Sequence, residues 1–529
     1  MTGRARLSDW FSRLVAAIAL MAVAACASAS RAASPPSVST AGERYEGLNW
    51  ADEARGGIFL GIPFAAPPID ALRWKPPQAL PSTGEPIGAK TFAPACMQGD
   101  YIVSWYASLI KSFHGDPSLA ARPVGESEDC LYLNVWSPDL KPAAPLPVMV
   151  WIHGGSYKGG WSYEPDYVGD ALARRGVIVV SIAYRLGPFG YLAPEDAGGH
   201  APVNLGLMDQ VAALKWVKQN IGAFGGDPEN ITVFGESAGA SSIGTLLVSP
   251  AGKGLFRRAI SESGGFEFEP AGTRQEAYHA FNELRAALAA QGQPIETAPA
   301  SAILSASNSV LSDYDFGPVV DGDLLPRQPA RLLADGSVRP VDLLIGTNRD
   351  EWLMYISGAT ADEEFDRWRN RLSGNEQLVD DLRQTYGTLG ALDRLETASQ
   401  MRCPGRSLAR AVSQKGGHSY VYEFMRARPE PADPPVGSYH GAEIPYVFGT
   451  HDDWLPTDAA DLKITDAMMS AWTAFAATGD PEMPGLGRSW PDYGKTGKVV
   501  AIDERPAIRP PSDEALCAAM NEQDDQGQD

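Results

Sequence analysis

The stretch "ITVFGESAGASSIGTLLV", residues 231–248, passes from a β-branched, apolar run into a helix-prone run through two glycines and a serine. Residues Gly235 to Gly239 match the pattern G-x-S-x-G, in which the serine occupies a sharp turn between a strand and a helix. The residues two positions away must be small, because side chains there would clash in so tight a turn. The pattern predicts that Ser237 lies beyond the end of a buried strand, at a helix N-terminus that favours negative charge.

Apolar, β-branched runs recur along the chain. They are residues 148–152, 177–183, 231–235, 342–346 and 420–424. Between the second and third runs, residues 206–221 place apolar side chains at helical spacing. Strands that bracket helices in this way predict an α/β fold with a large, mostly parallel sheet flanked by helices. The charged, helix-prone segments 274–310 and 360–412 are predicted to be helical insertions over the carboxyl-terminal edge of the sheet.

Composition excludes some partners. The chain has 529 residues, of which 44% are hydrophobic, so it can bury a large core. Its formal net charge is -21, and such an acidic surface repels nucleic acid and anionic membranes. We therefore expect no nucleic-acid partner.

The N-terminus has the layout of a secretory signal, with an apolar stretch from Leu14 to Ala25 between basic and small residues. That stretch is too short to span a bilayer. Two outcomes stay open: cleavage after Ala29, or lipidation of Cys26, because "VAAC" resembles a bacterial lipobox. Both predict an exported protein, periplasmic or secreted, that contacts a membrane only through a lipid anchor at Cys26.

The chain divides into four predicted parts. Residues 1–29 are the signal, 30–42 a Ser/Pro/Ala-rich linker, and 43–517 a single domain without internal repeats. The acidic stretch 518–529 is expected to be disordered, because its composition offers little apolar surface to bury. Besides Cys26 the chain has four cysteines, which export allows to form disulfides in any of three pairings.

A serine hydroxyl attacks only when a base removes its proton, and an acid then holds the imidazole in place. Folds built on this elbow arrange these residues in the order serine, acid, histidine. After Ser237, His440 and His451 lie in predicted loops, and either can be the base. Asp350 and Glu351 follow a predicted strand, and either can be the acid.

Taken together, the motifs resemble those of the type-B carboxylesterase family, the α/β-hydrolases that include bacterial p-nitrobenzyl esterases and the animal cholinesterases. The matching stretches are 59–77, 128–138, 183–192, 204–228, the elbow, 316–322, 346–351, 440–449 and 472–481. They cover nearly all of the chain after the linker. The resemblance implies an α/β-hydrolase fold and hydrolysis of small to medium carboxylic esters through an acyl-enzyme, with no metal or organic cofactor.

The resemblance also chooses among the open alternatives. The family motif G-x-x-x-D-E makes Glu351 the acid of the triad, and H-G-x-E-I-P makes His440 the base that activates Ser237. The disulfides that it implies are Cys96 with Cys130 and Cys403 with Cys517.

The resemblance further implies a set of backbone donors for the oxyanion. In the family a strand leads into H-G-G-G, whose second and third glycines donate N–H groups; here the stretch is His153-Gly154-Gly155-Ser156. With the residue after the elbow serine, the predicted donors are Gly155, Ser156 and Ala238. Ser156 departs from the pattern, and we expect its N–H to act, not its hydroxyl.

The substrate is less constrained. Cholinesterases hold a quaternary ammonium on a tryptophan in the first disulfide loop, and this chain has residues 119–121, Leu-Ala-Ala, at that spacing. This argues against a choline ester, although Trp105 lies in the same loop. Candidate wall residues for an ester pocket are Trp161, Phe266, Phe316, Trp352 and Tyr439.

The resemblance leaves two alternatives to hydrolysis of soluble esters. Some family members keep the fold without catalysis and serve adhesion, but these typically lose the serine, which is present here. A true lipase would need activation at an oil–water interface. Whether the protein is a monomer or a dimer stays open.

Overall fold

The computed structural model describes residues 35–526 apart from 41, 51–54, 83, 197, 265–270 and 430, with side chains described up to residue 521. The predicted signal, with Cys26, and the first part of the linker lie outside the described residues. Within the described part of the chain, no helix is long and apolar enough to cross a bilayer.

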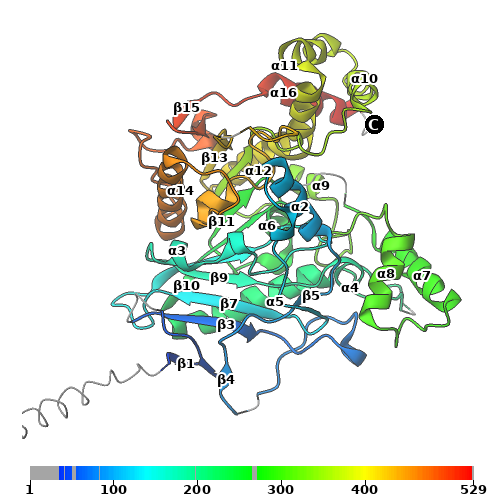
Figure 1. Cartoon of the computed structure of the whole chain (residues 1–529), viewed down its shortest axis with the longest axis vertical. Helices are drawn as coiled ribbons and strands as arrows, with labels where there is room; N and C mark the ends of the chain where they lie inside the picture. Colours follow the sequence, from blue (N-terminus) through cyan, green and yellow to red (C-terminus); the bar gives the residue numbers. More distant parts are fainter. Residues whose placement is uncertain are drawn as a thin grey trace, which may run out of the picture.

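A sheet of ten strands runs through the described part of the chain (Figure 1). In spatial order the strands are β15 (Ala507–Arg509), β14 (Val499–Ile502), β13 (Ser419–Phe424), β12 (Asp342–Asn348), β11 (Arg258–Glu262), β10 (Gly226–Glu236), β8 (Leu146–Ile152), β9 (Ile178–Ile182), β7 (Tyr132–Ser137) and β3 (Gly57–Pro63). Neighbours from β14 to β9 are parallel, and β15, β7 and β3 join antiparallel at the two edges. The mostly parallel α/β sheet predicted from the apolar runs is confirmed.

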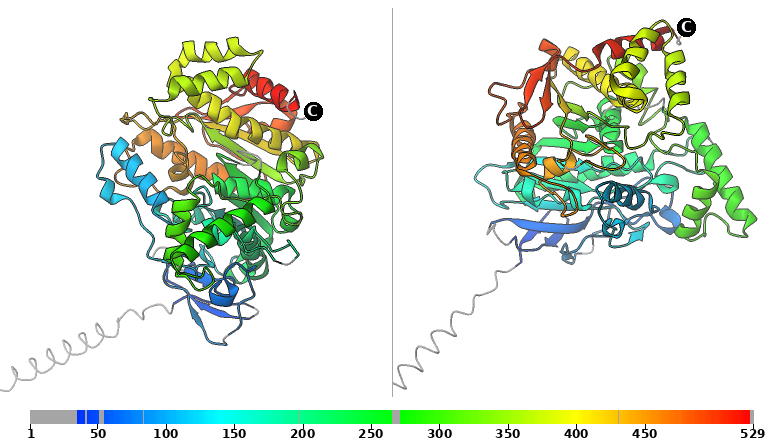
Figure 2. Two further views of the ribbon diagram at one scale, coloured as in Figure 1. Left: turned by 90° about the vertical axis from the view of Figure 1, so that its right-hand side faces the viewer. Right: turned by 45° about the horizontal axis from the view of Figure 1, so that its top comes forward.

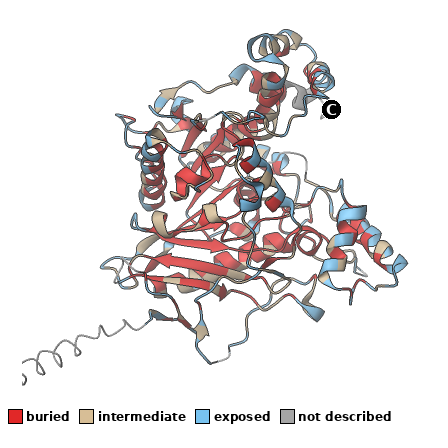
Figure 3. Cartoon of the chain, in the orientation of Figure 1, coloured by how far each residue is buried: buried red, intermediate tan, exposed pale blue. Residues whose placement is uncertain are grey.

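Successive residues of the central strands face opposite layers. Val148, Val150 and Ile152 of β8 belong to one apolar core with α5 (Leu205–Asn220) and α6 (Ala238–Val248). Met149 and Trp151 belong to a second core with α14 (Ala459–Thr478) on the other face. The strands are thus buried on both sides, as Figure 3 shows, which is why their sequences are continuously apolar and not alternating.

Shorter elements complete the described part of the chain. The helices are α2 (Tyr101–Ser112), α3 (Asp170–Ala173), α4 (Gly187–Gly190), α9 (Pro329–Ala334), α12 (Cys403–Gln414), α13 (Ile444–Phe448) and α15 (Tyr493–Thr496). A small sheet consists of β1 (Ser37–Ser39), β2 (Arg44–Glu46) and β4 (Ile87–Gly88), and β5 (Ala95–Cys96) pairs with β6 (Glu126–Ser127).

Two helical insertions follow the carboxyl ends of β11 and β12. The first consists of α7 (Arg274–Ala290) and α8 (Ala300–Val310), which pack against the core that contains α5 and α6. The second contains α10 (Ala361–Arg371) and α11 (Glu376–Thr397), which lie apart from the first pair in both Figure 1 and Figure 2.

The end of the chain differs from the prediction. Helix α16 (Glu514–Gln526) covers most of the acidic stretch 518–529 that composition assigned to disorder. Its residues Leu516 and Met520, one helical turn apart, join a small core with α10 and α11. A disulfide to α12 ties the same helix down. Leu516 and the disulfide at Cys517 thus hold the start of α16, and Met520 is the residue of the acidic stretch that joins this core.

Both disulfides implied by the family resemblance are present. Cys96 and Cys130 close the loop that contains α2, and Cys403 and Cys517 join α12 to α16. Disulfides of this kind are typical of extracellular or periplasmic proteins.

Candidate active site

The elbow serine lies where β10 ends and α6 begins. Ser237 has φ 53° and ψ −121°, a strained combination for a residue with a side chain, and its N–H donates to Glu262 O at 3.0 Å. Cβ atoms added at Gly235 and Gly239 would come within 2.5 Å and 2.0 Å of Ile152 O. Both positions are glycine because the turn packs directly against the end of β8.

His440 and Glu351 meet at the carboxyl edge of the sheet. Glu351 follows β12 and is fully buried, and His440 lies in the loop between β13 and α13. His440 Nδ1 is 2.8 Å from Glu351 Oε2. The other carboxylate oxygen, Glu351 Oε1, accepts a hydrogen bond from Asn348 N at 2.6 Å, which holds the acid in place.

The alternative acid and base are engaged elsewhere. Asp350 pairs with Arg349 at 2.7 Å and accepts from Ser438 N at 2.7 Å. His451 Nε2 is 2.7 Å from Thr465 Oγ1. Neither Asp350 nor His451 lines the cavity that Ser237 and His440 share.

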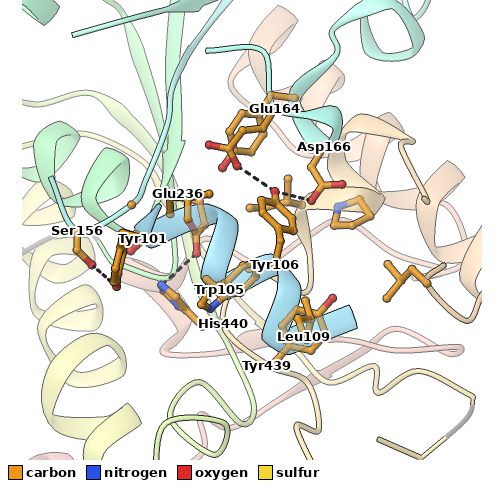
Figure 4. A pocket seen from close by; sticks show the side chains of 18 of the residues that line it. Tyr101, Trp105, Tyr106, Leu109, Ser156, Glu164, Asp166, Glu236, Tyr439 and His440 are labelled. Carbon is orange, nitrogen blue, oxygen red and sulfur yellow. Dashed lines mark hydrogen bonds and ion pairs between the residues drawn. The ribbon is translucent and has the colours of Figure 1, made fainter. Parts of the chain in front are cut away.

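That cavity is open to solvent, measures about 660 Å³ with its open mouth included, and has a largely aromatic wall. The aromatic residues that line it are Tyr101, Trp105, Tyr106, Tyr167, Tyr355, Tyr439 and Trp454. The first three come from α2, so the first disulfide loop forms one side of the cavity (Figure 4). Trp105 Nε1 donates to Tyr355 OH at 2.8 Å, which joins this side to the loop after Glu351.

Sequence reasoning found only part of this wall. Of its aromatic candidates Tyr439 lines the cavity, whereas Trp161, Phe316 and Trp352 do not, and Phe266 lies outside the described residues. The missed signal was the helical spacing of Tyr101, Trp105 and Leu109, which places three apolar side chains on one face of α2.

Glu236, the residue before the elbow serine, is a second acidic neighbour of the histidine. Its Oε1 is 3.3 Å from His440 Nε2 (Figure 4). Burial raises the pKa of Glu236 to about 8, and the positive charge on His440 opposes the shift. Burial by itself lowers the pKa of His440, but Glu236 and Glu351 outweigh it and raise the pKa to about 9. The two titrations are therefore coupled, because the charged form of each side chain stabilises the charged form of the other.

A further acidic group lines the cavity around Tyr106. The Tyr106 hydroxyl lies 2.9 Å from Glu164 Oε2 and 3.1 Å from Asp166 Oδ2. Burial raises the pKa of Glu164 to about 8 and that of Asp166 to about 7. Because the hydroxyl has one proton to donate, both contacts can be hydrogen bonds only when one carboxyl group is protonated.

The loop after β8 approaches the elbow closely. A Cβ atom at Gly154 would lie 2.9 Å from Glu236 O and 3.1 Å from Ser237 Cβ. Gly155 has φ 105°, and its carbonyl accepts hydrogen bonds from the N–H groups of residues 158 and 159 at 3.0 Å each. Gly155 and the next residue line the cavity beside Ser237. Because residues 154 and 155 are glycines, the loop brings backbone atoms and not side chains close to Ser237.

Ser156 adopts the left-handed conformation that the family's glycine would adopt without cost, with φ 52°. Its hydroxyl is exposed and lies 3.2 Å from Tyr101 OH (Figure 4). The side chain therefore contacts α2 and belongs to no acid–base pair.

Among the described residues, no group of three or more His, Cys, Asp or Glu side chains is placed to hold a metal ion. The model of the carboxylesterase family matches residues 35–520. The chain belongs to the carboxylesterase family. It is a carboxylic ester hydrolase that acts on small-molecule esters.

Relatives of this carboxylesterase are similar over most of their length. The chain is 35% identical over 469 residues to the para-nitrobenzyl esterase of Bacillus subtilis (strain 168), an alignment that covers 85% of this chain and 91% of the relative. It is 34% identical over 475 residues to carboxylesterase 1C of Mus musculus, covering 82% of this chain and 83% of the relative. A solved structure of a PNB esterase superposes with a TM-score of 0.76 at 32% identity, covering 92% of this carboxylesterase and 99% of that chain.

Proposed function

We propose that this esterase hydrolyses small to medium carboxylic esters through an acyl-enzyme, with Ser237 as nucleophile, His440 as general base and Glu351 as the acid that orients it. The hydrogen bond of 2.8 Å between Glu351 and His440, beside the cavity that also receives the elbow serine, is the observation that carries the proposal. A buried carboxylate in this position holds one tautomer of the imidazole and stabilises its protonated form.

In the first step Ser237 Oγ attacks the ester carbonyl carbon while His440 Nε2 takes the hydroxyl proton. The carbonyl π electrons move onto oxygen, and the resulting oxyanion accepts hydrogen bonds from the N–H groups of Gly155, Ser156 and Ala238. In the resting enzyme Nε2 lies 3.3 Å from Glu236 Oε1, so it exchanges this contact for the serine when substrate arrives.

The tetrahedral intermediate then collapses. The bond to the alcohol oxygen breaks, and His440 returns its proton to that oxygen, which leaves an acyl group on Ser237. A water molecule attacks the acyl carbon by the same route, with His440 again removing a proton, and the carboxylic acid leaves as the serine regains its hydrogen.

A fluorophosphonate probe, which phosphonylates activated serines, tests the nucleophile. We expect the wild-type enzyme to be labelled at Ser237 and Ser237→Ala to stay unlabelled. Ser156→Ala is the matched control, because it removes the neighbouring serine hydroxyl of the same cavity and should be labelled like the wild type. Equal labelling of wild type and Ser237→Ala would refute the proposal.

Rates on short-chain p-nitrophenyl esters test the substrate class. Hydrolysis that saturates below the solubility limit of the ester supports a soluble substrate. A jump in rate once the ester forms droplets would instead indicate a lipase.

A further inference from the structure

Gln98 makes a two-way clamp on the backbone of Gly160. Gln98 Nε2 donates to Gly160 O at 2.9 Å, and Gly160 N donates to Gln98 Oε1 at 2.7 Å. The glutamine is 4% exposed, so water does not replace these hydrogen bonds. It lies two residues after Cys96 in the loop that the first disulfide closes.

Gly160 is the far end of the loop that carries the proposed oxyanion donors. Its φ is 107°, and a Cβ atom there would come within 2.5 Å of His153 Nδ1 and 2.7 Å of Gly154 O. The backbone of Gly160 therefore packs against the residues that begin the loop. At that beginning Tyr184 OH donates to His153 O at 2.7 Å, so the loop is held at both ends.

The first disulfide loop touches the same segment along its length. A Cβ atom at Gly155 would lie 3.1 Å from Ile102 Cδ1, and one at Gly159 would lie 3.0 Å from Ile102 Cγ1 and 3.1 Å from Gln98 Oε1. The start of α2 and the glutamine together form the surface on which the loop rests.

Gln98 is itself anchored on the side of the disulfide. With its second amide hydrogen, Gln98 Nε2 donates to Cys96 O at 3.2 Å. The backbone N–H of Gln98 donates to Glu126 Oε2 at 3.3 Å. The strand that contains Cys96 pairs with the strand that contains Glu126. Both donors and the acceptor of the side-chain amide are thus used, and the clamp has one geometry.

We propose that Gln98 is a positioning residue for the oxyanion donors: through Gly160 it sets where the N–H groups of Gly155 and Ser156 lie relative to Ser237. The inference rests on the proposed function, because those N–H groups matter only if an oxyanion forms on Ser237. Donors of this kind act only when they are placed in advance at the site of developing charge.

The test replaces Gln98 with methionine, which keeps the length of the side chain and removes its hydrogen bonds. We expect Gln98→Met to lower kcat about tenfold to hundredfold, less than the loss of a whole donor, with KM changed by no more than about twofold. A trifluoromethyl ketone provides the second readout. Ser237 Oγ adds to its carbonyl carbon, the hydroxyl proton passes to His440, and the new oxyanion binds the same donors, so its Ki should rise by the factor that kcat falls.

Asn204→Leu is the matched control. Asn204 is a fully buried amide that clamps Val319 in the same two-way manner, with both hydrogen bonds at 2.8 Å. Both substitutions remove a buried clamp, so both should lower the melting temperature, but only Gln98→Met should raise Ki relative to KM. Should Gln98→Met not fold, Gln98→Glu, which keeps the acceptor for Gly160 N, replaces it and should show a smaller rise.

The outcomes separate the inference from the proposed function. If Gln98→Met folds and keeps the wild-type kcat and Ki, or shifts the ratio of Ki to KM no more than Asn204→Leu does, the glutamine is structural and the inference is wrong. If the ketone inhibits Ser237→Ala as strongly as the wild type, the proposed function fails instead.

Discussion

Glu236 and His440 lie 3.3 Å apart in the cavity, so the charge of the Glu236 carboxyl affects the pH at which the imidazole loses its proton. As the proposed general base, His440 must be neutral, so we expect activity to rise as the pH rises through its pKa. Burial lowers that pKa, and the carboxylates of Glu236 and Glu351 raise it to about 9. Neutralising Glu236 removes one of the charges that hold the proton on the histidine, and those of Glu351 and Glu443 remain.

We therefore expect Glu236→Gln to shift the acidic limb of the kcat/KM profile to lower pH by about one unit. The profile is measured with a soluble p-nitrophenyl ester from about pH 6 to about pH 11, which brackets the pKa of about 9. Glu164→Gln is the control, since it neutralises a buried carboxyl of the same cavity that makes no contact with His440. An unshifted limb in Glu236→Gln would mean that Glu236 is already protonated in the working enzyme.

The proposed triad predicts large effects at two positions. His440→Ala removes the base and Glu351→Gln removes the charge that orients it, so each should lower kcat by about three to four orders of magnitude with the fold intact. His451→Ala is the control, because His451 contacts Thr465 outside the cavity. Near-normal activity in His440→Ala combined with its loss in His451→Ala would reverse the assignment.

At the scale of elements, each disulfide restrains a different helix relative to the rest of the chain. The bond between Cys96 and Cys130 closes the loop of α2, which forms a wall of the cavity. The bond between Cys403 and Cys517 joins α12 to α16, whose core with α10 and α11 contributes no residue to that wall. Losing the two bonds should therefore have different consequences.

Cys517→Ser, paired with Cys403→Ser to avoid a free thiol, opens a loop with a sequence separation of 114 residues. On the loop-entropy model this lowers the free energy of unfolding by about 5 kcal/mol. We expect a lower melting temperature and earlier proteolysis of α16, with KM and kcat little changed at 25 °C. The matched pair Cys96→Ser with Cys130→Ser should lose kcat as well, and loss of kcat in the first pair would contradict this division.

At the scale of the whole molecule, several buried or partly buried carboxyl groups have raised pKa values. They are Glu164, Asp166, Glu236, Asp393 and Glu443, and burial is the largest cause in each case. A carboxyl whose pKa is higher in the folded than in the unfolded chain binds its proton more tightly when folded. Stability from these groups is therefore complete only below their ordinary pKa of about 4, and it is lost progressively as the pH rises from there through about 7 to 8.

We expect the melting temperature to fall between pH 6.5 and pH 9. His440 acts in the same direction, because its pKa is raised to about 9, and its contribution is lost as the pH rises through that value. His153 and His451 have pKa values lowered to about 4, mainly by burial, so they oppose the trend only below their ordinary value near 6.5. Scanning calorimetry at constant salt measures the slope.

Glu164→Gln tests the cause of that slope. It removes one titrating group from the cavity and should flatten the pH dependence by about 1 kcal/mol or more between the two pH values. A melting temperature that stays constant or rises with pH in the wild type would show that these carboxyls are charged in the folded protein.

Much of the fold follows from local patterns. A strand buried on both faces must be continuously apolar, and the five apolar runs are all strands of the sheet. Likewise the turn at Ser237 packs against Ile152 O and must have glycine at 235 and 239. The sequence pattern alone therefore indicates the elbow. Composition did not indicate helix α16, since charge dominates the stretch 518–529, while the packing of Leu516 and Met520 depends on α10 and α11.

The sequence by itself determined the α/β architecture, the elbow, the candidate acid and base, and the family, because each is written in residues close together or in motifs that match a family. Only the tertiary structure decided that Trp105 forms a wall of the cavity, that Glu236 faces His440, and that Gln98 clamps Gly160. These contacts join residues on different elements. Their distances depend on how the sheet, α2 and the loops pack together, and no periodicity within one segment encodes that packing.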